Sequence, residues 1–393
     1  MDDKGRRLKI LGIAMALVVG ACSGGASNAP STAAGTPAAS TEASAEASPP
    51  AGPFKISFSN YIEAAPLFHS MHTQLDTVLS SKDTGVEIKW YDNKGDPQVM
   101  LQNVQLMIQD KPDALVVYPV TASTQGISQL IKDSGIPCVT LNLDTPDCDF
   151  LNIDNAALGV DSAKIVGEIA KSRGWNASNT FVLIGQNAAA GEQVNACVTN
   201  FYSTIADILG LDKVAATDIG AQTTKIGQNA IQFDGNSQLE SSFTAVSNLL
   251  PAVPTGYNII LYTVNNDSTS GALRALAASG RADNDKTLIA GLGGDKTGVD
   301  NLRSDPRWVA EGDIFFNWWG EYAVAMAQSL AKGIKPPADV TALPQIVLSK
   351  DTVDQYLLPD SVEAKQLPAL DSTNEFLKQG GFLQIINNIP GLQ

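Results

Sequence analysis

The chain has 393 residues, of which 44% are hydrophobic and 17% charged, which is enough apolar material for about two domains of ordinary size. Its 41 acidic and 26 basic residues leave a formal charge of −15, which repels phosphate backbones and argues against nucleic acid as a partner. Two histidines, His69 and His72, and four cysteines without C-x-x-C spacing supply few ligands for zinc or iron–sulfur clusters. Neither a metal site nor a cofactor is therefore predicted.

Residues 1–21 have the pattern of a cleavable export signal. Four basic residues precede an uncharged, apolar run at 10–21, which is too short to cross about 30 Å of hydrocarbon. The run ends in residues 19–22, which resemble the bacterial lipobox, where the cysteine receives lipid and becomes the new N-terminus. We therefore expect lipidation at Cys22; the alternative is an ordinary secretory peptide with an incidental cysteine.

Residues 22–52 predict a disordered Ala/Ser/Pro linker. This stretch contains no Lys or Arg and almost no large apolar residue, so it cannot offset the entropy lost on folding. A signal, a lipidated cysteine and a polar linker together predict a soluble body anchored by lipid to the extracytoplasmic face of a cell membrane.

From residue 54 onward, short apolar runs alternate with amphipathic stretches, which predicts an α/β fold of parallel sheets covered by helices. Asp96 as N-cap and Pro97 in the first turn predict the start of one helix. Further helices are expected at 155–173, before Gly174, and at 268–280. Seven runs are expected to form strands: 54–58, 86–90, 114–118, 136–141, 181–184, 258–262 and 287–290.

Nine short stretches along the chain resemble, in order, the type I periplasmic binding proteins, which are the ribose- and galactose-binding receptors of ABC importers. Each motif is weak alone, but their order from about residue 54 to residue 343 is specific. The stretches are 96–98, 113–121, 134–140, 152–159, 265–267, 271–276, 280–281, 291–295 and 320–323.

The resemblance implies two Rossmann-like lobes with parallel sheets, joined by a hinge of three segments. Carried over, the N-terminal lobe comprises 54–155 and 267–312, and the C-terminal lobe comprises 156–263 and 313–345. Residues 346–393 exceed what the resemblance requires, and we expect them to wrap the surface as a C-terminal extension.

The resemblance also implies a function without catalysis. A monomeric lipoprotein would capture a sugar or sugar-like polyol in the cleft between its lobes and deliver it to an ABC permease. The alternative is a ligand-sensing receptor of the same fold that reports to a membrane sensor protein. An enzyme is not expected, because the sequence has no G-x-S-x-G elbow and no histidine outside the first helix.

Polar and aromatic residues after the strands of the first half are candidate ligand contacts, because parallel sheets bind ligands at their carboxyl ends. Asn60 follows the first strand, and Phe68 matches the family's aromatic that stacks on the sugar; alternatively, Phe68 is the first core residue of its helix. Asn142 and Asp144 follow the fourth strand, where they either bind a hydroxyl or form the turn before Pro146.

In the second half the resemblance assigns polar groups to the lobe crossovers and strand ends. Asn266 and Asp267 match the family's Asn-Asp at one crossover, with helix capping as the alternative. Asp295 matches an aspartate that accepts from sugar hydroxyls, and its alternative is a tight-turn carboxylate. Asp313 lies at the third crossover, close to Trp318 and Trp319, of which one is expected to face the cleft and the other the core.

One departure concerns an arginine that the family places in the second lobe. Residues 191–201 contain none, and Asn195 or Gln193 would have to donate in its place. This favours an altered polyol or another small polar ligand over a simple hexose or pentose. Apart from Cys22, three cysteines remain in an oxidising compartment, so we expect one disulfide and one free thiol. The resemblance places Cys148 and Cys197 in loops near the cleft, which implies a disulfide between them, and Cys138 is expected to be buried in its strand as a small hydrophobic residue.

Overall fold

A computed structural model describes residues 52–220, 224–338, 340–369 and 372–386. The expected export signal, Cys22 and the linker up to residue 51 lie outside these residues. Among the described helices, none is long and apolar enough to cross a membrane.

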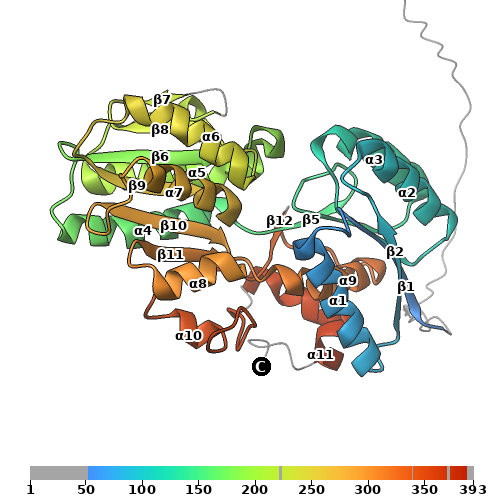
Figure 1. Ribbon diagram of the computed structural model, residues 1–393. Helices are drawn as coiled ribbons and strands as arrows, with labels where there is room; N and C mark the ends of the chain where they lie inside the picture. The colour runs from blue at the N-terminus through green and yellow to red at the C-terminus, as the bar shows by residue number, and fades with distance from the viewer. Residues whose placement is uncertain (1–51, 221–223, 339, 370–371, 387–393) are drawn as a thin grey trace, which may run out of the picture. The chain divides into compact units, whose positions relative to one another are not determined.

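Two sheets organise the described residues, and each forms the centre of one lobe (Figure 1). The first sheet is parallel throughout. Its strands lie in the order β12 (Val340–Ala342), β5 (Asp149–Asn152), β4 (Cys138–Leu141), β3 (Ala114–Val117), β1 (Phe54–Asn60) and β2 (Val86–Asp92). The α/β class and the parallel sheets expected from the sequence are therefore confirmed.

The second sheet is parallel except at its two edges, where β13 and β7 run antiparallel to their neighbours. Its strands lie in the order β13 (Ile346–Leu348), β11 (Trp308–Asp313), β10 (Thr287–Gly293), β9 (Asn258–Thr263), β6 (Thr180–Gln186), β8 (Ala230–Asp234) and β7 (Lys225–Ile226).

Both faces of the first sheet are buried, as strand β3 illustrates. Ala114 and Val116 pack into the main hydrophobic core, whereas Leu115 and Val117 belong to a smaller core under α2 and α3. Because side chains alternate between the faces of a strand, an entirely apolar strand requires helices on both sides. The helices of this lobe are α1 (Pro66–Ser81), α2 (Pro97–Gln109), α3 (Thr124–Ser134), α9 (Trp319–Ala331) and α11 (Phe382–Ile386).

The start of α2 and the end of α4 confirm two predicted boundaries. Asp96 caps α2 by accepting from the backbone N–H groups of Gln98 and Val99, at 2.7 and 3.1 Å. Helix α4 ends at Ser172, and Gly174 follows in the left-handed conformation, with φ of 75°.

Close packing of α4 (Asn155–Ser172) on α5 (Gly191–Leu209) depends on one glycine. A Cβ atom at Gly159 would lie 2.0 Å from the carbonyl oxygen of Cys197. Only glycine therefore allows the two helices this separation. The second lobe is completed by α6 (Leu239–Leu249), α7 (Asn266–Ala278), α8 (Lys296–Ser304) and α10 (Val353–Tyr356).

The strand pairing corrects the expected division into lobes. Residues 267–312 were assigned to the first lobe, but β10 pairs with β9 and β11 with β10, so this segment continues the second sheet. Residues 313–345 were assigned to the second lobe, but α9 packs on β1, β3 and β4, and β12 pairs with β5 of the first sheet. The chain therefore returns to the first lobe only after Asp313.

The C-terminal residues are part of both lobes instead of a surface wrap. Strand β13 forms an edge of the second sheet, and the guanidinium of Arg303 on α8 donates to the backbone oxygens of Leu358 and Ser361. Beyond these residues, the 3₁₀ segment Ser372–Gly380 and α11 pack on α9. Phe376 and Phe382 are buried there, because they complete the apolar cover of α9.

Two of the crossing segments are joined side by side. The backbone N–H of Asp154 donates to Oε1 of Gln345 at 2.6 Å, and Nε2 of Gln345 donates to the backbone oxygen of Asp154 at 3.0 Å. Asp154 follows β5, and Gln345 lies between β12 and β13. These two of the passages between the lobes are therefore held together by a reciprocal pair of hydrogen bonds.

The disulfide differs from the expected pairing. Cys138 is bonded to Cys148, with Cα atoms 4.7 Å apart, while Cys197 is a free, buried thiol. Cys138 begins β4, and Cys148 directly precedes the neighbouring strand β5, so strand pairing brings them together. Cys197 lies in α5 of the other lobe, where burial raises the pKa of its thiol to about 12.

Candidate functional site

Aromatic side chains cluster where β1 and β3 of the first sheet end. Tyr61 directly follows β1, Tyr118 directly follows β3, and Phe68 lies in the first turn of α1. The ring of Phe68 lies edge-on to those of Tyr118 and Phe316, at 5.2 Å in both cases, and 5.0 Å from that of Tyr61. Tyr61 and Phe68 are only half-buried, so the cluster presents ring surface to solvent as well as to the core.

Asn60 holds the loop that carries this cluster. Its Nδ2 donates to Oε2 of Glu63 at 2.9 Å and to the backbone oxygen of Phe68 at 3.1 Å, while its Oδ1 accepts from the N–H of Tyr61. The side chain is buried and its two amide protons are both used. Asn60 therefore positions Tyr61 and Phe68 through hydrogen bonds to their backbones.

Asn142 and Asp144 lie in the loop between β4 and β5. Asn142 has φ of 68°, a left-handed conformation that asparagine tolerates, as the turn interpretation requires. Asp144 is exposed, and its backbone N–H lies 3.4 Å from Oε1 of Gln193 on α5 of the second lobe. Asp144 lines a pocket of about 180 Å³ together with Thr121 of the first lobe and Glu192 of the second.

Asn195 does not offer the donor that the absent arginine would supply. Its Nδ2 donates to the backbone oxygens of Asn187 and Gly191, both at 2.7 Å, and its Oδ1 accepts from the N–H of Asn187. The side chain is 7% exposed, so its two amide protons are committed to the loop after β6. Of the two proposed substitutes, Gln193 is the exposed one.

Asn266 is also engaged within the protein. Its Nδ2 donates to Oε1 of Glu311 at 2.7 Å, and its Oδ1 accepts from the N–H of Leu292 at 3.0 Å. The carboxyl group of Glu311 accepts further bonds from the N–H of Gly294 and from Nε1 of Trp308. Although these donors favour the ionised form, burial dominates and raises the pKa of Glu311 to about 8. This network fixes the ends of β10 and β11 relative to α7.

Asp267 and Asp295 are the carboxylates that remain accessible beside this network. Asp267 is exposed, and Asp295 is half-buried. Asp295 caps α8 by accepting from the N–H of Gly298 at 2.9 Å through one oxygen. Burial raises the pKa of Asp267, and the charge of Asp295 raises it further, which indicates that the two carboxylates are neighbours.

Asp313 and Trp318 carry unpaired polar atoms at the crossover into the first lobe. Asp313 is buried, and its Oδ1 accepts from the N–H of Phe315 at 2.8 Å, while its Oδ2 has no partner among the described residues. Burial raises the pKa of Asp313 to about 7. Nε1 of Trp318 also lacks a partner there. Such atoms cost about 1–3 kcal/mol each unless water or a ligand meets them.

The structure shows which of the two tryptophans belongs to the core, a question that the sequence left open. Trp319 is 2% exposed, and its Nε1 donates to the backbone oxygen of Ile314 at 2.8 Å, so it belongs to the core. Trp318 is only half-buried, so it is the tryptophan whose ring is accessible to a ligand.

The strand ends therefore combine two chemistries. The first lobe supplies ring faces and edges, which suit the C–H surfaces of a ring compound, and the second supplies carboxylates, which accept from hydroxyl groups. Tyr61, Tyr118 and Phe316 were missed as members of this cluster. Tyr61 comes three residues after the predicted strand 54–58, and Tyr118 ends the predicted strand 114–118, so the strand-end rule could have found both. Glu311 lies within a strand and gave no signal in the sequence.

Comparisons with known proteins agree with this architecture. Residues 56–335 match the family described as the periplasmic binding protein domain. No curated protein matches the chain.

Several solved structures share the fold at low sequence identity. An ABC transporter periplasmic solute-binding protein from Actinobacillus succinogenes 130z, with bound D-allose, is 18% identical, covering 77% of this chain and 99% of that one, with a TM-score of 0.61. One from Bacillus halodurans C-125, with bound myo-inositol, is 15% identical (78% and 98%, TM-score 0.60). One from Mycobacterium smegmatis, with bound glycerol, is 19% identical (80% and 100%, TM-score 0.60).

Proposed function

Since the chain belongs to the periplasmic binding protein family, we propose that it captures a neutral sugar or sugar-like polyol between its two lobes and delivers it to an ABC importer. The family is one of solute-binding proteins, not of enzymes. The similar proteins with bound D-allose, myo-inositol and glycerol support a polyhydroxylated ligand.

One observation carries the proposal: the strand ends of the first lobe present aromatic rings, and those of the second present carboxylates. Phe68 is the half-buried ring at the centre of the aromatic cluster, and Asp295 keeps one carboxylate oxygen beyond the one that caps α8. A sugar has C–H faces that pack on rings, and hydroxyl groups that must not be buried unpaired.

The charge of the candidate residues narrows the class of ligand further. None of the candidate ligand residues predicted from the sequence is basic, and four of them are aspartates: Asp144, Asp267, Asp295 and Asp313. Such a set repels phosphate and carboxylate groups, so a sugar phosphate or sugar acid is disfavoured. Hydroxyl donors on a neutral ligand would also satisfy the unpaired Oδ2 of Asp313.

A thermal-shift screen with sugars, polyols, inositols and nucleosides tests the proposal. A ligand at 100 times its dissociation constant stabilises the fold by about 2.7 kcal/mol, which raises the melting temperature measurably. A flat response to all four classes would contradict the proposal.

Replacing Asp295 tests the second lobe. Asn is as good an N-cap as Asp, so Asp295→Asn keeps α8 capped while removing one charged acceptor. We expect the ligand-induced shift to be lost and the melting temperature without ligand to be preserved. The matched control is Asp161→Asn, which removes an exposed aspartate of α4 in the same lobe and should leave the shift unchanged. An unaltered shift in Asp295→Asn would remove this residue from the site.

The proposal includes a lipid anchor at Cys22, an extracytoplasmic location and a monomeric state. In a bacterial host, Cys22→Ser should move the protein from the membrane fraction to the soluble extracytoplasmic fraction.

Cross-linking of the ligand-bound protein in its native membrane should recover an ABC permease subunit. Recovery of a sensor protein instead would support the alternative function, and light scattering that reports a dimer would contradict the monomer.

A further inference from the structure

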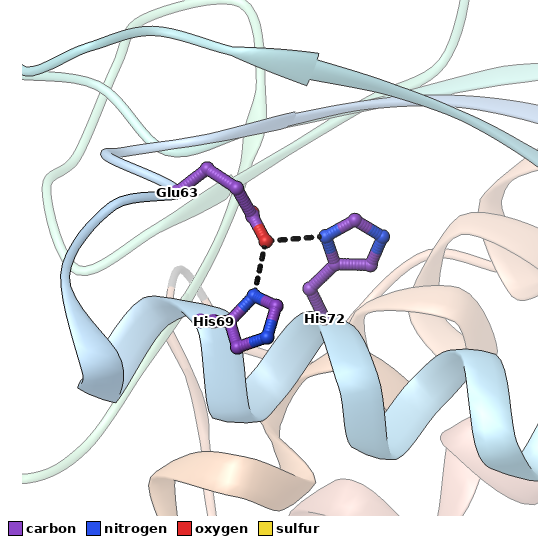
Figure 2. Close-up of side chains that lie close together, drawn as sticks. All are labelled: Glu63, His69 and His72. Carbon is purple, nitrogen blue, oxygen red and sulfur yellow. Dashed lines mark hydrogen bonds and ion pairs between the residues drawn. The ribbon is translucent and has the colours of Figure 1, made fainter.

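Both histidines of the chain converge on one carboxylate oxygen beside α1 (Figure 2). Nδ1 of His69 lies 2.6 Å from Oε1 of Glu63, and Nδ1 of His72 lies 2.9 Å from the same oxygen. His69 and His72 are one helical turn apart, so they project from the same face of α1. The three atoms that these residues could offer to an ion lie within 4.8 Å of one another.

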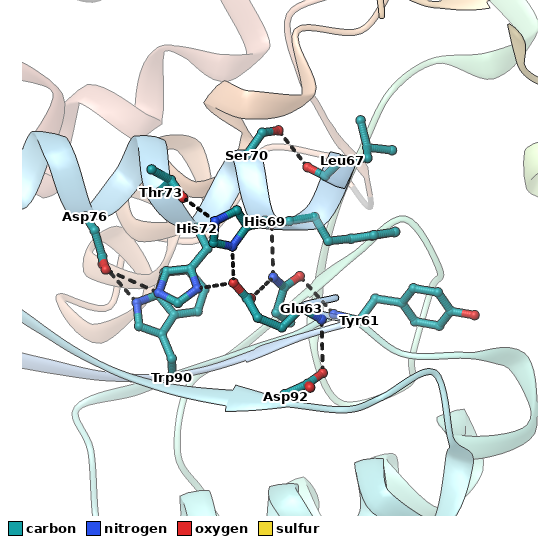
Figure 3. Close-up of polar contacts among 12 residues, drawn as sticks. Tyr61, Glu63, Leu67, His69, Ser70, His72, Thr73, Asp76, Trp90 and Asp92 are labelled. Carbon is teal, nitrogen blue, oxygen red and sulfur yellow. Dashed lines mark hydrogen bonds and ion pairs between the residues drawn. The ribbon is translucent and has the colours of Figure 1, made fainter. Parts of the chain in front are cut away.

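Neighbouring groups hold Glu63 in place from two sides (Figure 3). Its Oε2 accepts from Nδ2 of Asn60 at 2.9 Å, and its backbone N–H donates to Oδ1 of Asp92 at 3.1 Å. The carboxylate is therefore fixed before anything binds to Oε1.

His72 is held by a further carboxylate and an aromatic ring. Its Nε2 lies 3.2 Å from Oδ2 of Asp76, and its ring packs on that of Trp90 with 3.9 Å between centroids. Nε1 of Trp90 donates to the other oxygen of Asp76 at 3.0 Å, which fixes that carboxylate in turn (Figure 3). Histidines that bind metal ions typically have this arrangement, in which the second ring nitrogen donates to a carboxylate.

The two nitrogens of His72 therefore face two different carboxylates. A neutral imidazole donates from only one nitrogen. If Nε2 donates to Asp76, the lone pair of Nδ1 points at the negatively charged oxygen of Glu63, and the two repel each other. A cation placed between Nδ1 and this oxygen is attracted to both. Either a second proton or a metal ion supplies that cation, and His69 adds a further nitrogen at the same point.

We propose that Glu63, His69 and His72 bind a divalent first-row transition metal ion of the zinc class, with Nδ1 of each histidine and Oε1 of Glu63 as ligands. Imidazole and carboxylate groups suit zinc, and a site with three protein ligands leaves a fourth position for water. The proposal does not depend on the identity of the solute bound between the lobes.

Binding of the ion requires an adjustment of the side chains. Tetrahedral zinc with bonds of 2.0–2.1 Å places its ligand atoms about 3.3 Å apart, so the two N···O distances of 2.6 and 2.9 Å must lengthen by about 0.4–0.7 Å. The side chain of His69 is 62% exposed and can rotate. A groove of about 590 Å³, lined by both histidines, Asp76 and Thr73, gives access to solvent and room for the water ligand.

No metal site was predicted from the sequence, because it has only two histidines and its four cysteines lack C-x-x-C spacing. Two histidines suffice here because a glutamate in the loop before α1 completes the set. The spacing that encodes it is Glu-x5-His-x2-His, with Asp76 four residues after His72 as the supporting carboxylate.

Isothermal titration with Zn²⁺ tests the site in protein purified without a polyhistidine tag. One Zn²⁺ per chain is expected. His69→Gln, His72→Gln and Glu63→Gln should each weaken binding at least tenfold, and Asp76→Asn, which keeps all three ligands, should weaken it roughly tenfold. Glu87→Gln on the neighbouring strand β2 makes the same charge change at an exposed residue outside the cluster and should leave affinity unchanged.

Nitrogen NMR gives an independent reading, because a ¹⁵N-histidine-labelled chain contains only two imidazoles. On adding Zn²⁺, the Nδ1 signals of both should shift, while Nε2 of His72 stays protonated through Asp76. The proposal is overturned if both imidazole spectra are unchanged by Zn²⁺, or if the ligand variants, folded by circular dichroism, bind Zn²⁺ as tightly as the parent. Either result would mean that a proton, and not a metal ion, lies between the histidine nitrogens and Oε1 of Glu63.

Discussion

Reduction of the Cys138–Cys148 disulfide should destabilise the first lobe by an amount that follows from its loop length. The two cysteines are 10 residues apart in the sequence, and the chain-entropy relation for a loop of this size gives about 2.7 kcal/mol at 25 °C. The bridge joins the start of β4 to the residue before β5, so its loss releases the loop that carries Asn142 and Asp144.

The assay is urea-induced unfolding with and without a phosphine reductant, in the parent and in two cysteine variants. The parent should lose about 2.7 kcal/mol on reduction. Cys148→Ser already lacks the bridge, so the reductant should have no effect on it. Cys197→Ala retains the bridge and should respond like the parent. A Cys197→Ala variant that no longer responds would show that Cys148 pairs with Cys197, and the strand-pairing argument would be wrong.

Three further predictions follow from the packing and the buried charges. Gly159→Ala should destabilise the second lobe by about 1–3 kcal/mol in urea unfolding, because its Cβ would lie 2.0 Å from the carbonyl oxygen of Cys197; full parental stability would contradict the close approach of α4 and α5. Glu321 in α9 is fully buried, and burial raises its pKa from a usual value of 4.5 to about 8, so the folded chain holds a proton that the unfolded chain releases between these pH values. Stability should therefore fall as pH rises through this range, and Glu321→Gln should weaken that dependence in unfolding measured at pH 6 and pH 9; an unchanged slope would mean that Glu321 is ionised in the fold. Phe68→Leu keeps an apolar side chain but removes the ring, so affinity for the ligand found in the screen should fall roughly 3–10-fold by titration calorimetry, and an unchanged affinity would place Phe68 outside the site.

Local structure was largely predictable from the sequence, because its causes are local. All seven predicted strands are present, although β3 and β4 are shorter than expected, and the N-cap Asp96 fixes the start of α2. Six strands were not predicted: β7, β12 and β13 have only two or three residues and carry no periodicity, and the longer β5, β8 and β11 were also missed.

Long-range relationships were predicted less well. Residues 267–312 and 313–345 were each predicted in the wrong lobe, because the point at which a chain crosses between lobes has no sequence signature. The lobe of a segment is decided by strand pairing, such as that of β10 with β9, which the sequence alone does not reveal. The pairing of Cys148 likewise follows from the adjacency of β4 and β5, which spacing alone does not reveal.

The candidate site shows the same limit at the level of single side chains. Asn195 and Asn266 have residue types suited to binding sugars, yet their amides are used to hold loops. Residue type and strand position therefore predicted the neighbourhood of the site, but burial and hydrogen-bond partners decide which groups are left to bind a ligand.

The division of the chain between the lobes has a consequence for the order of assembly during synthesis. From α4 to β11, residues 155–313 form the second lobe almost without interruption, so its core can close as soon as this segment has emerged. The first lobe begins at Phe54, but α9 covers its sheet only after residue 331, and Phe382 packs on that helix later still. The lobe that the ribosome starts first is thus the one that finishes folding last.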